Sequence, residues 1–287
     1  MARPHPPAPV PIDLDAGTRA LEAMLARPRL AGLEVAPDGS LAVVGVTTPA
    51  PDGTRTRTQL WALDPAGAAD PRPLTRAAAG ALQAAFLPDG DLLFTSPRPD
   101  PEAAEPPADP PVALWRLPRA GGEPELVLAP PGGVTGVWVA AGTGLVVVGA
   151  PVLPTAADLA ADAERGKART EAEVTALLFD PGTYPVAYWD RWLGPREPAL
   201  WVLDLDRPAP AEGLRPLARG RALHGAGVAV SPDGSTVVTT WQRTDRRAGP
   251  ADLVTDLVAI EVATGEQRVL AADGRAFGAP AISSDGT

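Results

Sequence analysis

Short apolar runs alternate with turn-forming residues along most of this chain. The clearest case lies at 230–238, where one apolar run leads into Pro232-Asp233-Gly234 and a second apolar run follows. Proline suits the second position of a type I turn, aspartate tolerates the third, and glycine accepts the positive φ that comes next. The stretch therefore predicts two antiparallel strands joined by a bulged hairpin. The same turn recurs at 36–40 and 87–91, without its proline at 283–286, and in a weaker form at 141–144.

These turns have a regular spacing. The proline position falls at residues 37, 88, 141, 232 and 284, so successive turns are 51, 53, 91 and 52 residues apart. Each complete hairpin is followed by a third apolar stretch, at 60–64, 114–117, 200–204 and 257–261, and by a fourth, at 72–75, 125–128, 215–218 and 268–270. Four short strands in about 50 residues, repeated at a constant period, predict the blades of an all-β protein, a β-propeller.

The repeats divide the chain into about four blades and the start of a fifth. We expect blades at 30–76, 81–129, 133–219 and 223–271, with the next beginning at 276–287. The one long step between turns is explained by an insertion at 151–198 in the third blade. Because the last turn lacks its returning strand, the propeller is expected to be incomplete and the chain to be a fragment of a longer polypeptide.

Two segments before the first blade differ from the repeats. Residues 1–12 are rich in proline and are expected to be a disordered tail. Residues 13–28 predict a short helix that Asp13 or Asp15 caps and that Pro28 ends. Its apolar residues fall on one side, namely Leu14, Leu21, Met24 and Leu25.

The insertion is expected to be partly helical. Residues 155–169 predict a helix, and Thr170-Glu171-Ala172-Glu173 fits a capping box for a further turn. Residues 174–179 fit a strand equally well. The segment 184–192 holds both tyrosines and two of the seven tryptophans, which we expect to pin the insertion onto the blades, with a binding surface as the alternative. A second interruption, the acidic and proline-rich 97–111, predicts a solvated extended loop.

Composition narrows the classes of partner. The formal net charge of −10 and the lack of any basic cluster disfavour nucleic acid and anionic membranes as partners. The chain has no cysteine, which excludes disulfides and thiolate chemistry, and it has no apolar run long enough for a membrane helix. The proline-rich start lacks the apolar region of a secretory signal, so a cytoplasmic protein is expected.

The sequence offers no complete catalytic or metal-binding set. It contains no Gly-x-Ser-x-Gly elbow, and its only histidines are His5 in the tail and His224, which is expected in a loop between blades. Glu171 and Glu173 would point apart on a helix, and Asp204 with Asp206 lacks the further oxygen ligands of a calcium loop. We therefore predict no catalytic, cofactor-binding or metal-binding residue and no cofactor, and we assign no substrate-binding residue.

Several of these stretches together resemble a known family. Residues 28–39, the Leu-Trp-x-Leu-Asp strands, and 184–192 leading into 200–204 resemble the N-terminal propeller of the prolyl oligopeptidase family of serine peptidases. The bacterial dipeptidyl-peptidase and acylaminoacyl-peptidase branch is the most similar. The resemblance covers nearly the whole chain from about Asp15 onward.

The resemblance implies a function for the intact protein. In that family a propeller limits the access of short peptides to a C-terminal α/β-hydrolase domain, which carries the catalytic Ser, Asp and His. That domain is absent from this chain, so the chain by itself is expected to be inactive as a peptidase. The alternative is a TolB-like or WD40-like propeller that serves as a protein-interaction module, because TolB-like propellers share the Pro-Asp-Gly repeat.

Overall fold

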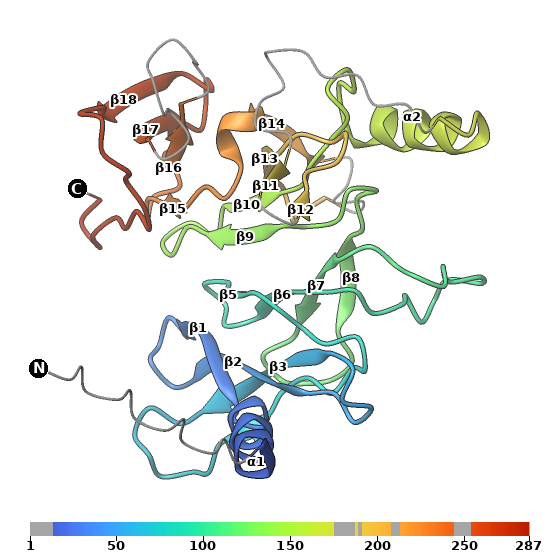
Figure 1. Cartoon of the computed structure of the whole chain (residues 1–287). Coiled ribbons are helices and arrows are strands. Elements are labelled where there is room, and N and C mark those ends of the chain that lie inside the picture. Colours follow the sequence, from blue (N-terminus) through green and yellow to red (C-terminus); the bar gives the residue numbers. More distant parts are fainter. Residues whose placement is uncertain (1–13, 175–186, 189–190, 208–212, 244–253, 287) are drawn as a thin grey trace, which may run out of the picture.

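The computed structural model describes residues 14–174, 187–188, 191–207, 213–243 and 254–286. Within these ranges the chain forms four antiparallel sheets of four strands each and one two-stranded hairpin. Neighbouring strands of a four-stranded sheet follow one another along the chain, except that the insertion with its hairpin separates the second and third strands of the third sheet. The sheets follow one another around an arc, with the first blade and the fourth blade on either side of its open part (Figure 1). The predicted β-propeller architecture is therefore confirmed, as an incomplete ring of four blades.

The strand bounds agree closely with the repeat pattern. The first blade contains β1 (Arg29–Val35), β2 (Ala42–Pro49), β3 (Thr56–Leu63) and β4 (Arg72–Pro73). The second contains β5 (Ala84–Phe86), β6 (Leu92–Ser96), β7 (Ala113–Leu117) and β8 (Glu125–Leu128). The third contains β9 (Gly136–Val139), β10 (Val146–Gly149), β13 (Ala199–Leu203) and β14 (Arg215–Arg219). The fourth contains β15 (Val228–Val230), β16 (Thr236–Gln242), β17 (Thr255–Glu261) and β18 (Gln267–Ala271).

The innermost strands give the arc its common centre. These are β1, β5, β9 and β15, the first strand of each blade, and each one contacts the next in turn. The outer strands of each sheet lie progressively farther from this centre, as in a propeller (Figure 1).

The repeated turns have the conformation that their residues predict. Gly39, Gly90 and Gly234 have φ values of 70°, 91° and 73°, which only glycine adopts without strain. The Asp38 carboxylate accepts hydrogen bonds from the Ser40 amide at 3.0 Å and the Ser40 hydroxyl at 2.6 Å. These bonds, and then a hydrogen bond from Arg119, lower the pKa of Asp38 to about 2. Hydrogen bonds between neighbouring residues thus stabilise this turn.

The core consists of three apolar layers, each between two neighbouring blades. Trp115 of β7 and Trp201 of β13 occupy equivalent positions, and each is only 1% exposed. Each indole faces the preceding blade and donates a hydrogen bond from Nε1, to the Ser96 carbonyl at 3.1 Å and to the Ala150 carbonyl at 2.9 Å. The Leu-Trp stretches at Trp115 and Trp201 therefore lie in the strands whose tryptophan packs against the preceding blade.

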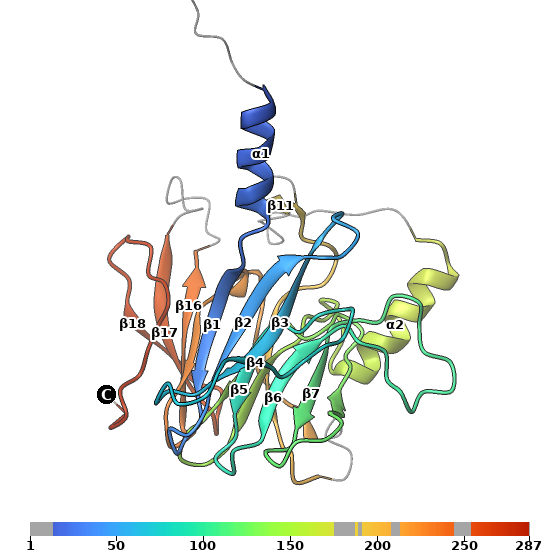
Figure 2. The ribbon, with the colours of Figure 1, turned by 90° about the horizontal axis from the view of Figure 1, so that it is seen from below.

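The two helices differ in how they relate to the blades. The N-terminal helix α1 (Leu14–Leu25) forms where it was predicted, but it projects away from the sheets (Figure 2). Consequently Leu21, Met24 and Leu25 are about half exposed. In contrast, α2 (Leu159–Glu171) in the insertion has a buried side chain, that of Asp162.

The capping-box prediction at Thr170 is wrong. Thr170 lies in the last turn of α2, where its hydroxyl donates to the Gly166 carbonyl at 3.1 Å. The residue that caps α2 is Asp158, whose Oδ1 accepts from the Ala161 amide at 2.7 Å. Glu173 follows the helix with φ of 49°, so a new helical turn does not begin there.

The rest of the insertion is described only in part. From the aromatic segment, β11 (Ala187–Tyr188) and β12 (Arg191–Trp192) pair as a small antiparallel hairpin. The remaining residues of that segment, most of the alternative strand at 174–179 and the predicted tail at 1–12 lie outside the described residues.

Candidate functional site

One end of the propeller carries the long connections. In each blade the Asp-Gly turn, or its weaker copy in the third blade, joins the first and second strands at one end of the sheet. Because the strands are antiparallel, the connection from the second strand to the third lies at the opposite end, together with the segment that leads in from the preceding blade. The long segments 97–112, 150–198 and 243–254 are all connections of this second kind. We call this the long-loop end, and it is the end from which α1 projects (Figure 2).

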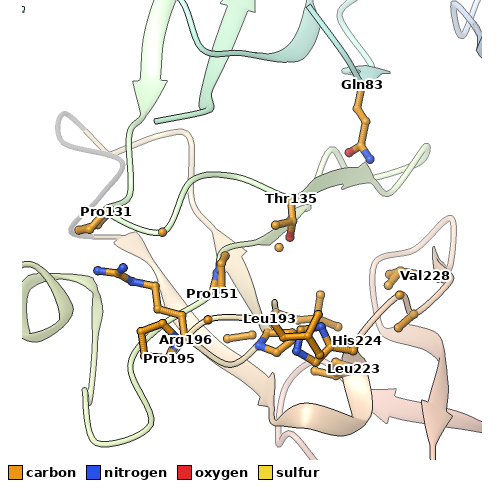
Figure 3. Close-up of a pocket in the computed structure, with 18 of the residues that line it drawn as sticks. Gln83, Pro131, Thr135, Pro151, Leu193, Pro195, Arg196, Leu223, His224 and Val228 are labelled. Carbon is orange, nitrogen blue, oxygen red and sulfur yellow. The ribbon is translucent and has the colours of Figure 1, made fainter. Parts of the chain in front are cut away.

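A cavity of about 620 Å³ lies at the long-loop end, and we call it the insertion cavity. Gln83, Thr135 and Val228 line it from the starts of the innermost strands in blades two, three and four. Leu193 and Arg196 of the insertion and His224 line its other side (Figure 3). The site thus forms where three blades and the insertion converge on the centre.

A buried ion pair holds the insertion at this cavity. The Arg196 Nε donates to both Asp162 carboxylate oxygens, at 3.1 and 3.3 Å. Asp162 has no exposed surface, and its Oδ1 also accepts from the Leu153 amide at 2.8 Å. Because the carboxylate joins α2 to both ends of the insertion, it positions the Arg196 side chain in the cavity wall.

His224 lies between the third and fourth blades, where the sequence places it. It follows the short 3-10 helix η3 (Arg221–Leu223). Its Nε2 lies 3.2 Å from Nη1 of Arg221, and a guanidinium can only donate in such a contact. The Arg221 Nη2 donates to the Gly194 carbonyl at 3.1 Å, and burial lowers the pKa of Arg221, with Glu197 opposing that shift. The histidine is therefore part of a hydrogen-bonded wall.

The insertion cavity has the composition of a binding site. Its described lining contains no serine and no carboxylate, and the hydroxyl and imidazole groups in it come from Thr135 and His224. It combines apolar and proline side chains with a few polar groups, as small-ligand sites do. The described residues support binding at this place.

The Trp138 indole is fitted closely against a glycine in this cavity. A Cβ atom on Gly136 would lie 2.1 Å from Cη2 of Trp138, far closer than any van der Waals contact. We expect Gly136→Ala to displace the indole and to lower the free energy of unfolding by about 1–3 kcal/mol. Urea unfolding followed by circular dichroism measures this. The matched control is Gly278→Ala, since nothing lies within 4 Å of a Cβ there, and equal stability of the two variants would contradict the packing.

A second cavity of about 440 Å³ adjoins the first, and we call it the inner cavity. The two cavities share Gln83 and Trp138 in their linings, so they meet near the centre of the arc. The inner cavity lies between the first and second blades and reaches β9 of the third. Its lining includes the carboxylate residue Glu34 of β1, and burial raises the pKa of Glu34 above its ordinary value of 4.5.

The acidic residues weighed from sequence lie away from both cavities. The Glu171 carboxylate is 3.9 Å from the Lys167 ammonium on the exposed side of α2, and that of Asp204 is 3.5 Å from the Arg207 guanidinium. His5 lies outside the described residues. No group of three or more possible metal ligands occurs in the described part of the chain. Neither described helix is long and apolar enough to cross a membrane.

Gln83, Trp138 and Glu34 were missed by sequence reasoning. Each lies in or just before an innermost strand, in an ordinary strand context that carries no chemical motif. The only signal that could have found them is position, because the first strand of every blade lines the centre of a propeller.

Comparison with solved structures relates this fold to peptidases. The chain is similar to the acylaminoacyl peptidase of Pyrococcus horikoshii, with a TM-score of 0.55 and 11% identity over 87% of this chain and 33% of that one. It is also similar to an acylaminoacyl peptidase solved in complex with Z-Gly-Gly-Phe-chloromethyl ketone, with a TM-score of 0.56 and 11% identity over 86% and 33%. A match to TolB from Acinetobacter baumannii covers 90% and 47% at 12% identity, with a lower TM-score of 0.47.

These likenesses concern the fold. The chain spans about a third of the length of the acylaminoacyl peptidases that it matches, which is consistent with the N-terminal propeller portion that the sequence resembles. No protein-family model matches the sequence, and no curated protein matches it.

Proposed function

We propose that this chain is the propeller portion of a serine peptidase of the prolyl oligopeptidase family. In this proposal it controls which peptides reach a C-terminal α/β-hydrolase domain of the same polypeptide, and the intact protein works in the cytoplasm. The observation that carries the proposal is the propeller fold shared with acylaminoacyl peptidases, together with adjoining cavities at its centre.

The first blade supports the presence of further blades. Trp61 of β3 pairs with Val44 in the same register as Trp115 with Phe94 and Trp201 with Val148. The later two tryptophans are buried against the preceding blade, whereas Trp61 is only partly buried and faces the open part of the arc. Leu30, Leu33 and Val35 of β1 share that side and are 70%, 63% and 51% exposed. An apolar face of this kind is suited to packing against another blade.

The dimensions of the cavities favour short peptides as the molecules that are admitted. Volumes of about 620 and 440 Å³ fall in the range of small-ligand sites. A folded domain of 100 residues has a radius of gyration of about 13 Å, too large for such a passage. These dimensions support the proposed role of the propeller as a size filter.

The proposal is tested first on the gene and on the purified chain. We expect the coding sequence beyond codon 287 to contain further repeats followed by Gly-x-Ser-x-Gly. We also expect the 287-residue chain to leave N-acetyl-alanine p-nitroanilide uncleaved, while the extended protein cleaves it. An extended reading frame without Gly-x-Ser-x-Gly would favour an interaction module instead. Cleavage of the substrate by the pure 287-residue chain would contradict the assignment of catalysis to a separate hydrolase domain.

Filtering is tested on the extended protein. The same cleavable sequence is presented as a free short peptide and as a loop of a folded protein. We expect cleavage of the peptide and none of the folded substrate. Equal cleavage of both would show that the propeller does not control access.

A further inference from the structure

Trp138 is in the lining of both the insertion cavity and the inner cavity. It belongs to β9, the innermost strand of the third blade, and it is only partly buried. The outer edge of its six-membered ring lies beside Gly136. A Cβ atom on that glycine would be 2.7, 2.1 and 2.8 Å from Cζ2, Cη2 and Cζ3 of the indole. The ring is therefore packed against the backbone of its own strand.

The same ring forms part of the wall of the insertion cavity. Gly136 is buried and is not in the described lining of that cavity, whereas Trp138 and Gly149 are. Gly149 is opposite Gly136 in the β9–β10 pairing, and a Cβ atom on Gly149 would lie 3.7 Å from Cη2 of the indole. The ring thus lies between Gly136 and the cavity, and the two glycines leave it room against the sheet.

A partly exposed indole can bind either a cation or a flat apolar group. The charges in the wall favour the apolar group. Among the described lining residues of the insertion cavity, the ionisable side chains are those of Arg196 and His224, and neither is acidic. A lysine or arginine side chain would therefore find no carboxylate there. Glu34, in the lining of the inner cavity, is exposed, so solvent already stabilises its charge.

The rest of the wall also suits an apolar group. Four prolines and three leucines are among the described residues that line the insertion cavity. Proline has almost no side-chain freedom to lose, so covering it costs little conformational entropy. An aromatic side chain brings a large apolar surface, and its stacking on another ring adds to what the buried area alone contributes.

We propose that the insertion cavity binds an aromatic side chain of a peptide, which stacks on the Trp138 indole. This proposal rests on the proposed function for its peptide ligand. It adds the class of side chain that the propeller recognises.

The experiment compares matched peptides on the 287-residue chain by isothermal titration calorimetry. The probes are acetyl-Ala-Phe-Ala-amide and acetyl-Ala-cyclohexylalanine-Ala-amide, whose side chains share one carbon skeleton and differ in aromatic character. We expect the Phe peptide to bind about three- to tenfold more tightly. Trp138→Leu should remove that difference and Trp138→Phe should retain part of it. Trp61→Leu alters a tryptophan that lines neither cavity and should retain all of it.

A second measurement does not depend on how well Trp138→Leu folds. A peptide with 4-nitrophenylalanine in place of Phe quenches the fluorescence of an indole on which it stacks. We expect saturating peptide to quench the unaltered chain more than Trp138→Phe, which lacks one of the seven tryptophans. Equal quenching of the two proteins would contradict stacking on Trp138.

Other outcomes would overturn the proposal as well. Equal binding of the Phe and cyclohexylalanine peptides, or binding of neither, would show that no aromatic side chain is recognised. A preference that survives Trp138→Leu would place the aromatic side chain elsewhere. Tighter binding of acetyl-Ala-Lys-Ala-amide than of the Phe peptide would show that the site takes a cation. These measurements need no hydrolase domain, so they can fail or succeed separately from the proposed peptidase function.

Discussion

Replacing Trp201 by alanine is expected to lower the free energy of unfolding by about 3–5 kcal/mol. Its indole is 1% exposed and packs in the layer between the second and third blades. Its removal leaves a large cavity and also leaves the buried Ala150 carbonyl without the Nε1 donor at 2.9 Å. Few other single substitutions in the described chain would remove so much contact between two blades.

Two further variants, measured by urea unfolding, test the hydrogen bond of Trp201 and the effect of its burial. Trp201→Phe keeps most of the ring packing and loses the hydrogen bond, so a cost of about 1–2 kcal/mol is expected. Trp61→Ala removes the equivalent tryptophan of the first blade, which is only partly buried, and should cost less than Trp201→Ala. If Trp61→Ala and Trp201→Ala were equally destabilising, the assignment of Trp201 to a joint between blades would be wrong.

Asp162→Ala is expected to release α2 from the two ends of the insertion and to lower the free energy of unfolding by about 2–4 kcal/mol. The substitution removes the acceptor of both the Arg196 Nε and the Leu153 amide from a site with no exposed surface. Arg196 keeps 26% of its side-chain surface exposed, so solvent recovers part of the loss. The freed segment should be cleaved faster by trypsin under native conditions.

Glu171→Ala provides a control on the same helix. Its ion pair with Lys167 is 3.9 Å long and both side chains are about two-thirds exposed, so its loss should change stability by less than about 0.5 kcal/mol. The insertion of Glu171→Ala should also resist trypsin as the unaltered protein does. Identical cleavage rates for Asp162→Ala and Glu171→Ala would mean that the buried pair does not hold the insertion.

The hairpins could be predicted because their determinants lie within a few residues of one another. In each full Pro-Asp-Gly turn the proline, the aspartate carboxylate and the glycine act on the same short stretch of backbone, whatever packs around it. The error at Thr170 has the opposite origin. A threonine with glutamate three residues later fits a helix start, yet α2 already runs through Thr170 from the Asp158 cap. The sequence around Thr170 fits both a helix start and the interior of a helix, and the chain continues α2 because its cap at Asp158 and its buried Asp162 stabilise that helix.

From its sequence alone this chain determines the hairpins, the period of about 50 residues and hence the blades, because turn geometry and strand alternation are local properties repeated along the chain. The tertiary structure alone decided which side chains meet at the centre. Glu34, Gln83 and Trp138 lie on different blades, and Asp162 and Arg196 are 34 residues apart. Their proximity depends on how successive sheets stack around an axis, and no short stretch of sequence contains that information.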